Sequence, residues 1–432
     1  MDWITSMIDI KLLRKNPEIV KMDLEKRYET EKTEWVDKIL EYDKEKRLLQ
    51  TEINELRHRR NILTTDVAKL RDQEKDLRPI LDEAKTIPDK IKKIENEFGE
   101  YTLKTQRLLE RIPNLTHESV PRGRDETENV VVRSWGIKPE FNFEPKDHID
   151  LGLALDIMDI ERAAKVSGAR FYYLKGVAAL LEVALIRLGF EVTTQEGFIP
   201  ILPPVMVRRE AIYGAGFLPA GEEDIYYVKD RDLCLVGTAE IPLAAMHMSE
   251  ILDEDQLPLY YAGFSSCFRT EAGAHGRDTK GIFRVHQFDK LELFTYTTPE
   301  TSWIEHEKLI SVVEKIYQRL GLHYRIVNIC SGELGATAAK KYDLEVWLPG
   351  QEKYREIVSC SNCTDYQARR LNIRVRKKTA EKPRLVHTLN STAVAMGRVI
   401  VAILENFQQE DGSVIIPKGL KKFLEISKIE KP

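Results

Sequence analysis

Cysteine is scarce in this sequence, which has 5 in 432 residues. A chain of this length with so few cysteines is not held together by a disulfide framework. Long apolar runs are also lacking, because no stretch approaches the ~20 residues that a membrane-spanning helix needs. Residues 1–9 contain acids and no basic cluster, so we expect neither a secretory signal nor a transit peptide. These absences predict a soluble, cytoplasmic protein that does not contact membranes.

An excess of charge of one sign is lacking as well. The chain has 66 Lys and Arg against 70 Asp and Glu, a formal net charge of −4. This balance excludes a histone-like binder of nucleic acid, so any such contact must come from local groups. Hydrophobic residues make up 42%, enough for a sizeable core. The length predicts two to four domains at roughly 100–200 residues each.

Glycine is nearly absent from about residue 31 to 110, a stretch rich in Glu, Lys, Arg, Leu and Ile. Two series of mainly apolar positions run through it with alternating steps of four and three, from Trp35 to Leu70 and from Ile80 to Ile112. This spacing is typical of a coiled-coil seam. The polar stretch 71–78 between the series predicts an antiparallel helical hairpin. Pro88 either kinks the second helix or marks its start, and we interpret it as a kink.

The charges of this hairpin leave two functions open. Basic residues gather on both predicted helices, namely Arg57, Arg59, Arg60, Lys85, Lys90, Lys92 and Lys93. Acids are interleaved with them, and such a mixture by itself favours a solvated helix face. The hairpin is therefore either a spacer or dimerising coiled coil, or an arm that lies along a polyanion.

The rest of the chain has a different organisation. Residues 1–111 form the predicted arm, 112–136 a linker with two prolines, and 137–432 a second domain. In this second domain, helical patterns at 171–189, 299–320 and 391–408 alternate with β-rich runs at 225–228, 260–264, 290–296 and 323–327. This alternation predicts an α+β domain built on a mainly antiparallel β-sheet flanked by helices.

Familiar nucleotide and hydrolase motifs are missing, including the phosphate loop, the dinucleotide fingerprint, H-E-x-x-H and G-x-S-x-G. A nucleotide would therefore be held by side chains. The richest segment is 264–294, where two β-like ends flank a Gly-rich loop at 272–281. The loop and its edges carry Arg269, Arg277, Lys280 and Arg284. Guanidinium groups suit phosphate oxygens, and Glu271 could accept from an exocyclic amine or coordinate a metal. The alternative is an ordinary hairpin with a charged tip.

Residues 268–271 and 284–288, on either side of this loop, resemble motif 2 of the class II aminoacyl-tRNA synthetases. Extended to Glu292, the string is similar to the version found in the seryl-tRNA synthetase family. Further segments resemble motif 1, the serine-binding loop, a second ATP element and motif 3, at 197–204, 236–243, 354–362 and 388–406 respectively. The linker also matches that family, so the resemblance covers the chain from about Met7. It implies an N-terminal antiparallel coiled-coil arm followed by a class II catalytic domain.

The resemblance implies a reaction and its partners. Members of this family activate L-serine with ATP and Mg²⁺ to seryl-adenylate. They then transfer serine to the 3′ end of tRNA(Ser), and tRNA(Sec) is a second candidate acceptor here. The family plan also implies a homodimer, formed through the motif 1 helix and strand. No structural zinc is expected.

The resemblance also carries roles onto individual residues of this sequence. The catalytic group is Arg269, Glu271 and Arg398. The residues expected to bind serine are Thr238, Ala239, Glu240, Arg269, Glu292, Asn390 and Thr392. The residues expected to bind ATP are Arg269, Thr270, Glu271, Val285, Glu356, Ile357, Val358, Ser359 and Arg398. Glu356 and Ser359 are also expected to hold Mg²⁺.

Several features depart from the family pattern or stay open. Motif 3 reads Asn390-Ser391-Thr392, which keeps a hydroxyl at the serine-contacting position, and Gly397 precedes the functional Arg398. Cys360 and Cys363 form a lone C-x-x-C, which favours a pair of reduced thiols over a metal site. For His286 we favour a packed or locally bonded ring over a general base.

Two other functions compete with the synthetase. A ligase that loads amino acids onto carrier proteins is disfavoured, because such homologues lack the coiled-coil arm. A catalytically silent regulator is disfavoured by the intact set Arg269, Glu271, Glu292, Glu356 and Arg398.

Overall fold

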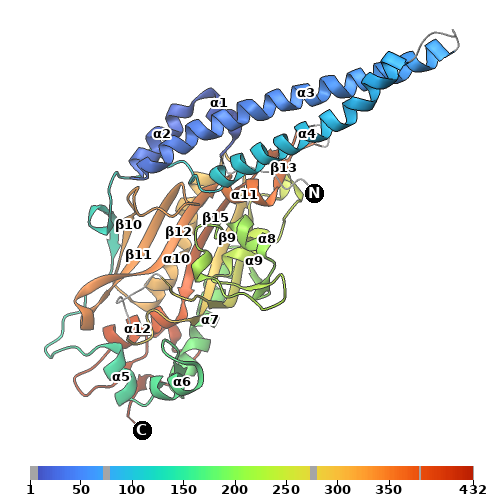
Figure 1. Ribbon diagram of the computed structural model, residues 1–432. Helices are drawn as coiled ribbons and strands as arrows, with labels where there is room; N and C mark the ends of the chain where they lie inside the picture. Colours follow the sequence, from blue (N-terminus) through green and yellow to red (C-terminus); the bar gives the residue numbers. More distant parts are fainter. Residues whose placement is uncertain (1–7, 72–77, 273–279, 379–380, 432) are drawn as a thin grey trace. The chain divides into compact units, whose positions relative to one another are not determined.

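The computed structural model describes residues 8–71, 78–272, 280–378 and 381–431 (Figure 1). It contains two compact units, Met1–Pro113 and Asn114–Pro432. Three features of the sequence lie outside the described residues or side chains. They are the heptad position Leu70, most of the polar stretch 71–78, and Arg277 with most of the predicted Gly-rich loop. Among the described residues, no helix combines the length and apolar character needed to cross a bilayer.

The first unit is helical, and its two long helices form the predicted hairpin. Its elements are α1 (Ile10–Lys15), α2 (Pro17–Lys26), η1 (Thr30–Lys32), α3 (Thr33–Arg71) and α4 (Arg78–Leu109). The heptad residues meet as expected, because Leu63 of α3 is buried against Ile87 and Ile91 of α4. Pro88 lies inside α4, so it does not mark the start of that helix.

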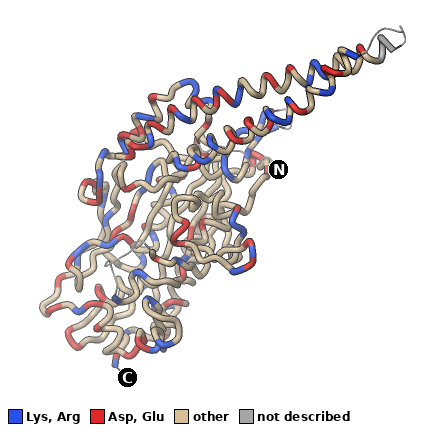
Figure 2. The backbone as a smooth tube through the Cα atoms, in the orientation of Figure 1, with Lys and Arg blue, Asp and Glu red and all other residues tan. Residues whose placement is uncertain are grey.

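Charges of both signs alternate along the hairpin, as Figure 2 shows. Two of the clustered arginines pair with acids of the opposite helix. Arg57 lies 2.8 Å from Glu95, and Arg59 donates two hydrogen bonds to Glu83 at 2.7 and 2.8 Å. These exposed pairs each contribute little to stability. Lys85, Lys90, Lys92 and Lys93 of α4 are exposed, so much of the positive charge on this helix faces solvent.

A buried carboxylate joins α1 to the start of the hairpin. Asp43 of α3 is 1% exposed and accepts two hydrogen bonds from Arg14, both at 2.7 Å, and one from Arg47 at 3.2 Å. Burial opposes ionisation of this carboxyl, but Arg14 and Arg47 outweigh it and hold the pKa of Asp43 below its usual value. The bidentate geometry makes this pair stronger than the exposed pairs of the hairpin.

The second unit is built on an eight-stranded sheet in the order β1-β10-β11-β12-β15-β9-β8-β4. Neighbouring strands are antiparallel, except that β4 runs parallel to β8. In that order the strands are Val130–Trp135, Tyr324–Asn328, Lys340–Leu348, Lys353–Thr364, His387–Ala395, Gln287–Thr297, Leu259–Phe268 and Ile199–Ile201. The predicted fold class is confirmed, with a mainly antiparallel sheet flanked by helices.

Helices and short strands complete this unit. The helices are α5 (His148–Ala154), α6 (Ile160–Ser167), α7 (Val177–Gln195), α8 (Arg209–Ala215), α9 (Glu240–Ala245), α10 (Ser302–Leu320), α11 (Tyr366–Leu371) and α12 (Met396–Asn406). The short helices are η2 (Glu126–Glu128), η3 (Glu222–Asp224), η4 (Glu254–Gln256), η5 (Pro349–Gln351) and η6 (Lys418–Leu420). The short strands are β2 (Met158–Asp159), β3 (Tyr173–Leu174), β5 (Met206–Val207), β6 (Cys234–Leu235), β7 (Ile251–Asp253), β13 (Arg374–Arg376), β14 (Arg384–Leu385), β16 (Val414–Ile415) and β17 (Lys428–Ile429).

The two faces of the large sheet are covered differently. Helices α7, α10 and α12 pack on one face, where Leu291 and Leu293 of β9 join the main core. Helices α8, α9 and α11 pack on the other, against Phe294 and Tyr296 of the same strand. Successive side chains of a strand point to opposite faces. Glu292 therefore lies on the face of Phe294, away from the main core, and this alternation positions the site described below.

Three boundaries expected from the sequence are corrected. Residues 225–228 contain no strand, only an isolated bridge from Tyr227 to Cys234. Residues 391–395 end strand β15, and the last long helix begins only at Met396, because these residues pair with β9 inside the sheet. The expected linker 112–136 is not wholly irregular, because its residues Val130–Trp135 form the edge strand β1, paired with β10.

The buried Asp43 generates a prediction about the arm. We expect Asp43→Ala to destabilise the packing of α1 on α3 by about 2 kcal/mol, since charged hydrogen bonds at a buried group are lost. Hydrogen exchange of the full chain should speed up in residues 10–50. The contribution is complete above about pH 4 and is lost as the pH falls through the lowered pKa of Asp43. Asp37→Ala is the matched control, because its carboxylate is 64% exposed beside Lys21. Equal exchange in both variants would contradict the prediction.

Candidate active site

A pocket of about 530 Å³ opens on the sheet face that carries Glu292. The residues that line it come from α9, the β8–β9 hairpin, β11, β12, β15 and the start of α12. Most residues that the sequence assigned to a site meet here, namely Glu240, Arg269, Glu271, Val285, Glu292, Glu356, Ile357, Ser359, Asn390, Thr392 and Arg398. Segments more than 150 residues apart in the chain, such as those of Glu240 and Arg398, thus share one cavity.

Four assigned residues do not line this pocket. Thr238 is buried behind it, where its Oγ1 accepts a hydrogen bond of 3.1 Å from the backbone N–H of Glu240. Ala239 is the N-terminal flanking residue of α9 and is fully buried. Thr270 donates its hydroxyl to the carbonyl of Glu223, and Val358 belongs to the main core on the opposite face of the sheet. These residues therefore support the pocket from outside.

Two buried carboxylates mark one end of the pocket. Glu240 is 8% and Glu292 is 1% exposed. Burial and the neighbouring charge of Glu292 raise the pKa of Glu240 to about 7. Burial also raises the pKa of Glu292, which Lys290 opposes with its Nζ 2.5 Å from Oε2. Lys290 and Arg269 are the cations that act on these two acids, and a carboxylate pair that lines a pocket can also attract a ligand ammonium group.

Side-chain amides hold Glu240 in place. Asn390 of β15 donates to Glu240 Oε1 at 3.0 Å, and Gln367 of α11 donates to the same oxygen at 2.8 Å. Asn390 also approaches the thiol of Cys363 at 3.5 Å. Asn390 thus acts on Glu240 besides facing the pocket.

Arginines mark the other end of the pocket. Arg269 donates from Nε to the carbonyl of Gly237 at 3.0 Å, which fixes the plane of its guanidinium group. Arg284 donates to Glu271 at 3.1 Å, across the base of the loop. Arg398, near the start of α12, donates to both the carbonyl and the carboxylate of Glu356, at 3.1 and 3.3 Å. Such groups match the oxygens of a polyphosphate.

The sequence reasoning missed several pocket residues. Phe283 and Phe288 line the pocket. Arg398 lies over the ring of Phe283 at 4.9 Å, and Arg269 lies over the ring of Phe288 at 5.4 Å. Lys341 of β11 also lines the pocket. Phe288 ends the segment 284–288 that resembles motif 2. No spacing rule, however, distinguishes an aromatic residue that faces a ligand from one in the core.

The residues assigned to Mg²⁺ fit that ion. Glu356 and Ser359 lie on the same strand and both line the pocket with oxygen donors, which Mg²⁺ prefers. The Glu356 side chain is 48% exposed, and Arg398 and Lys341 outweigh its partial desolvation and hold the pKa of the carboxyl below its usual value. The part of the chain that the structure describes contains no group of three or more His, Cys, Asp and Glu arranged for a metal. Binding at Glu356 and Ser359 would therefore also need oxygens from substrate phosphates.

Two features left open by the sequence have clear surroundings. The His286 ring bonds to the carbonyl of Arg269 through Nδ1 at 3.0 Å and lies beside Phe171, which agrees with a locally bonded ring. Cys360 and Cys363 are both buried in β12 as free thiols. Burial raises the pKa of both thiols.

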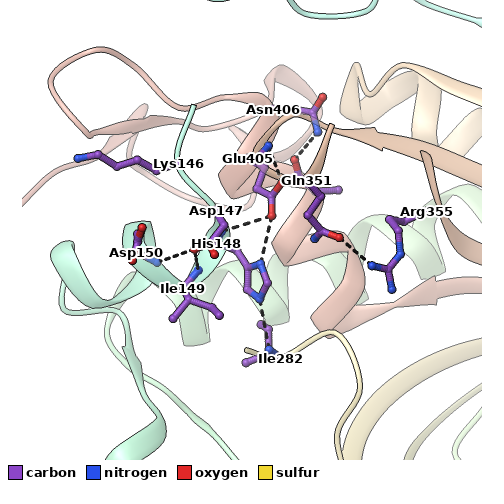
Figure 3. A network of polar contacts seen from close by, with 12 residues as sticks. Lys146, Asp147, His148, Ile149, Asp150, Ile282, Gln351, Arg355, Glu405 and Asn406 are labelled. Carbon is purple, nitrogen blue, oxygen red and sulfur yellow. Dashed lines mark hydrogen bonds and ion pairs between the residues drawn. The ribbon is translucent and has the colours of Figure 1, made fainter. Parts of the chain in front are cut away.

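A buried histidine anchors the irregular segment that leads from the loop into the pocket (Figure 3). His148 of α5 accepts a hydrogen bond from the N–H of Ile282 at 3.4 Å through Nε2, while Nδ1 lies 3.1 Å from Glu405 of α12. Gly281 has φ +75°, and a Cβ there would lie 2.1 Å from the imidazole. The neighbours of Ile282, including Phe283 and Arg284, line the pocket. The contact thus fixes where these side chains enter it.

The chain matches known proteins along most of its length. The model of the seryl-tRNA synthetase N-terminal domain matches residues 7–116. The model of the tRNA synthetase class II core domain (G, H, P, S and T) matches residues 226–407. A serine–tRNA ligase of Pyrococcus horikoshii is 52% identical over 98% of this chain and 98% of its own length. One from Methanoculleus marisnigri is 50% identical, with 97% and 99% covered.

Solved structures agree with these matches. The crystal structure of seryl-tRNA synthetase from Pyrococcus horikoshii complexed with ATP has a TM-score of 0.94 and 51% identity, covering 98% of this chain and 100% of that one. The cytoplasmic serine–tRNA ligase of Naegleria fowleri in complex with AMP has a TM-score of 0.88 and 32% identity, with 98% and 99% covered.

The network around Glu405 generates a prediction. Its Oε1 accepts from the N–H and ring of His148, and its Oε2 accepts from the N–H of Gly350 at 3.1 Å. In Glu405→Gln, one of these donors must face an amide NH₂, so we expect a loss of about 1–3 kcal/mol. Chemical denaturation should show this loss, with faster hydrogen exchange at residues 281–286. The exposed Glu410→Gln is the control, and unchanged exchange in Glu405→Gln would refute the anchoring role.

Proposed function

This chain belongs to the seryl-tRNA synthetase family, and on that premise we propose how its pocket joins serine to tRNA with ATP. The resemblance found in the sequence is confirmed by relatives that are about half identical over nearly the whole chain. The observation that carries the proposal is a single cavity with a buried carboxylate pair at one end and phosphate-matching arginines at the other. A small ammonium-bearing substrate and a nucleotide triphosphate can meet in such a cavity.

Serine binds at the carboxylate end. Its ammonium group is attracted by Glu240 and Glu292, and Thr392 offers a hydroxyl nearby on the pocket wall. A carboxylate that pairs with the seryl hydroxyl also distinguishes serine from alanine. Alanine would leave that buried acceptor without a donor, which penalises it far more than a lost methylene would.

ATP binds at the arginine end. Arg269 acts electrostatically on Glu240 as well as on Glu356, so it can contact both the serine carboxylate and the α-phosphate. We assign Arg398 to the outer phosphates, and Phe283 and Phe288, which line the pocket, add apolar surface for a purine. Glu271, held by Arg284, is available to accept from the adenine amine. Val285, Ile357 and Ser359 complete the proposed nucleotide site on the pocket wall, while Thr270 and Val358 support it from outside.

The chemistry then follows from placement and charge. An oxygen of the serine carboxylate attacks the α-phosphorus, and the bond from that phosphorus to the bridging oxygen of pyrophosphate breaks. Arg269 and Arg398 stabilise the charge that develops on the phosphoryl oxygens. Mg²⁺ at Glu356 and Ser359 would add positive charge beside the phosphates. In the second step the terminal ribose hydroxyl of tRNA attacks the acyl carbon and AMP leaves. The adenylate phosphate can take the hydroxyl proton, so His286 is not required as a base.

The two units divide the work in this proposal. Residues 1–111 are the arm that binds tRNA(Ser), 112–136 connect it, and 137–432 catalyse both steps. The exposed lysines of α4 can contact phosphates, whereas Arg57 and Arg59 are paired within the hairpin. tRNA(Sec) is a second acceptor to test. Because its tRNA substrate is used in translation, the protein acts in the cytoplasm.

We also propose a homodimer. Helix α7 leaves Leu180 and Val183 58% and 53% exposed, and Ile199 of the sheet edge strand β4 is 52% exposed. Apolar residues in adjacent elements form a patch that a second copy can cover. A two-fold axis would place the same patch on both subunits.

Serine-dependent exchange between ATP and pyrophosphate tests the first step. We expect exchange with serine and not with alanine. Arg269→Lys should lower kcat/KM for exchange by about 100-fold or more, because an ammonium group cannot reproduce the planar fork on developing charge. Arg374→Lys, a change at an exposed arginine of β13, is the control. No exchange with serine would overturn the function, and exchange without transfer to tRNA would favour the carrier-protein ligase.

Shortening the arm tests the division of work. We propose to replace residues 50–94 by a short Gly/Ser turn, which keeps Asp43 and the contact of the Tyr42 and Tyr101 rings at 5.9 Å. Exchange should stay within about threefold, while tRNA charging should fall by about 100-fold or more as phosphate contacts are lost. Gln at Lys85, Lys90, Lys92 and Lys93 of α4 should lower charging less and flatten its salt dependence. Equal loss of both steps would refute the modular proposal.

A further inference from the structure

A glutamine outside the pocket completes the carboxylate end. Gln367 of α11 has no exposed surface and does not line the cavity. Its Nε2 donates to Glu240 Oε1 at 2.8 Å and to the carbonyl of Ala215 at 3.0 Å. Its Oε1 accepts from the hydroxyl of Thr388 at 2.7 Å. The carbonyl of Ala215 can only accept, so the amide has one orientation, with its NH₂ toward Glu240.

The bonds on Glu240 leave one of its oxygens for a ligand. Both hydrogen bonds that the structure describes on this carboxylate, from Gln367 and Asn390, end on Oε1. Glu240 itself lines the pocket, so Oε2 is the oxygen that can meet a substrate. A carboxylate held on one side by two donors cannot rotate without breaking both bonds.

We propose that Gln367 is a positioning residue for recognition of the serine amino group, acting through Glu240. This role rests on the proposed function, in which Glu240 binds the ammonium group of serine. Gln367 fixes the direction of Oε2 and stabilises the charged form of the carboxylate by hydrogen bonding. It does not touch the substrate.

The electrostatic surroundings of Glu240 make this hydrogen bond important. Burial and Glu292 of β9 disfavour the charged form, whereas Lys290 of β9, Gln367 and Arg269 favour it. The thiol of Cys363 on β12 is the other titratable group that faces it. The balance leaves the pKa of Glu240 at about 7, so losing one donor moves it further up and reduces the ionised fraction at neutral pH.

A variant at Gln367 tests the positioning of Glu240 without changing direct contacts to the ligand, which a variant at Asn390 cannot do. Asn390 lines the pocket, so a variant there changes ligand contacts as well as Glu240. Gln367 lies behind Glu240, and its replacement leaves the surface that faces serine unchanged except through that carboxylate.

Gln367→Met tests the inference in the full-length enzyme, by steady-state exchange with serine and ATP varied separately. Methionine has a similar length and no amide donor. We expect the KM for serine to rise about 10- to 100-fold, as for the loss of a hydrogen bond to a charged group. The KM for ATP and kcat at saturating serine should stay within about twofold. The rise in serine KM should be larger near pH 6 than near pH 8.5, because protonation of Glu240 then removes its charge.

Thr388→Val is the matched control. It removes another buried hydrogen bond of the same glutamine but leaves the bond from Nε2 to Glu240. We expect a similar fall in melting temperature and a serine KM within about threefold of wild type. If both variants change serine and ATP kinetics alike, Gln367 has only a structural role and the proposal is overturned. If Gln367→Met does not fold, Gln367→Leu removes the same amide donor with a side chain of similar size. It should raise the serine KM by a similar factor, and an unchanged KM would overturn the proposal.

The wild-type enzyme separates this inference from the function on which it rests. Absence of serine-dependent exchange in the wild type would refute the proposed function. Normal exchange in the wild type with an unchanged serine KM in Gln367→Met would refute only the role of Gln367.

Discussion

The structure of the pocket depends on the free-energy cost of burying two carboxylates side by side. Glu240 and Glu292 are removed from water within one pocket, and each charge disfavours the other. A pair of this kind persists only where donors and a cation compensate it. Lys290 supplies the cation, while Asn390 and Gln367 supply donors from two further elements. These partners lie on different strands and helices, so the need to compensate the acids links distant parts of the chain.

The same requirement explains why the sheet has two unlike faces. Alternation along β9 places Leu291 and Leu293 in the main core and Glu292 on the opposite face. Helices α8, α9 and α11 cover only part of that second face, and the uncovered part forms the pocket. At the arginine end, Glu405 and His148 anchor the irregular segment that carries Phe283 and Arg284. The acidic end is thus positioned from behind by amides, and the basic end by a histidine and a buried acid.

Charge in the first unit follows a different rule. Its hairpin is stabilised by an apolar seam at Leu63, Ile87 and Ile91, while exposed pairs such as Arg57 with Glu95 add little. Asp43 is the exception, because it is buried and held by Arg14 in a bidentate pair. The exposed lysines of α4 remain for a polyanion. A net charge near zero is therefore compatible with a tRNA enzyme, since the whole-chain sum averages over groups with separate roles.

By itself, the sequence determined whatever depends on local periodicity or on an ordered set of motifs. Steps of four and three predicted the hairpin, and the motif segments pointed to Arg269, Glu292 and Arg398, which line one pocket. The edge strand β1 and the late start of α12 were missed, because pairing with a distant strand overrides local composition. Phe288, His148 and Gln367 were missed for the same kind of reason. Their roles depend on which side chains meet across the fold, and only the tertiary structure decides that Gln367 donates to Glu240, 127 positions earlier in the chain.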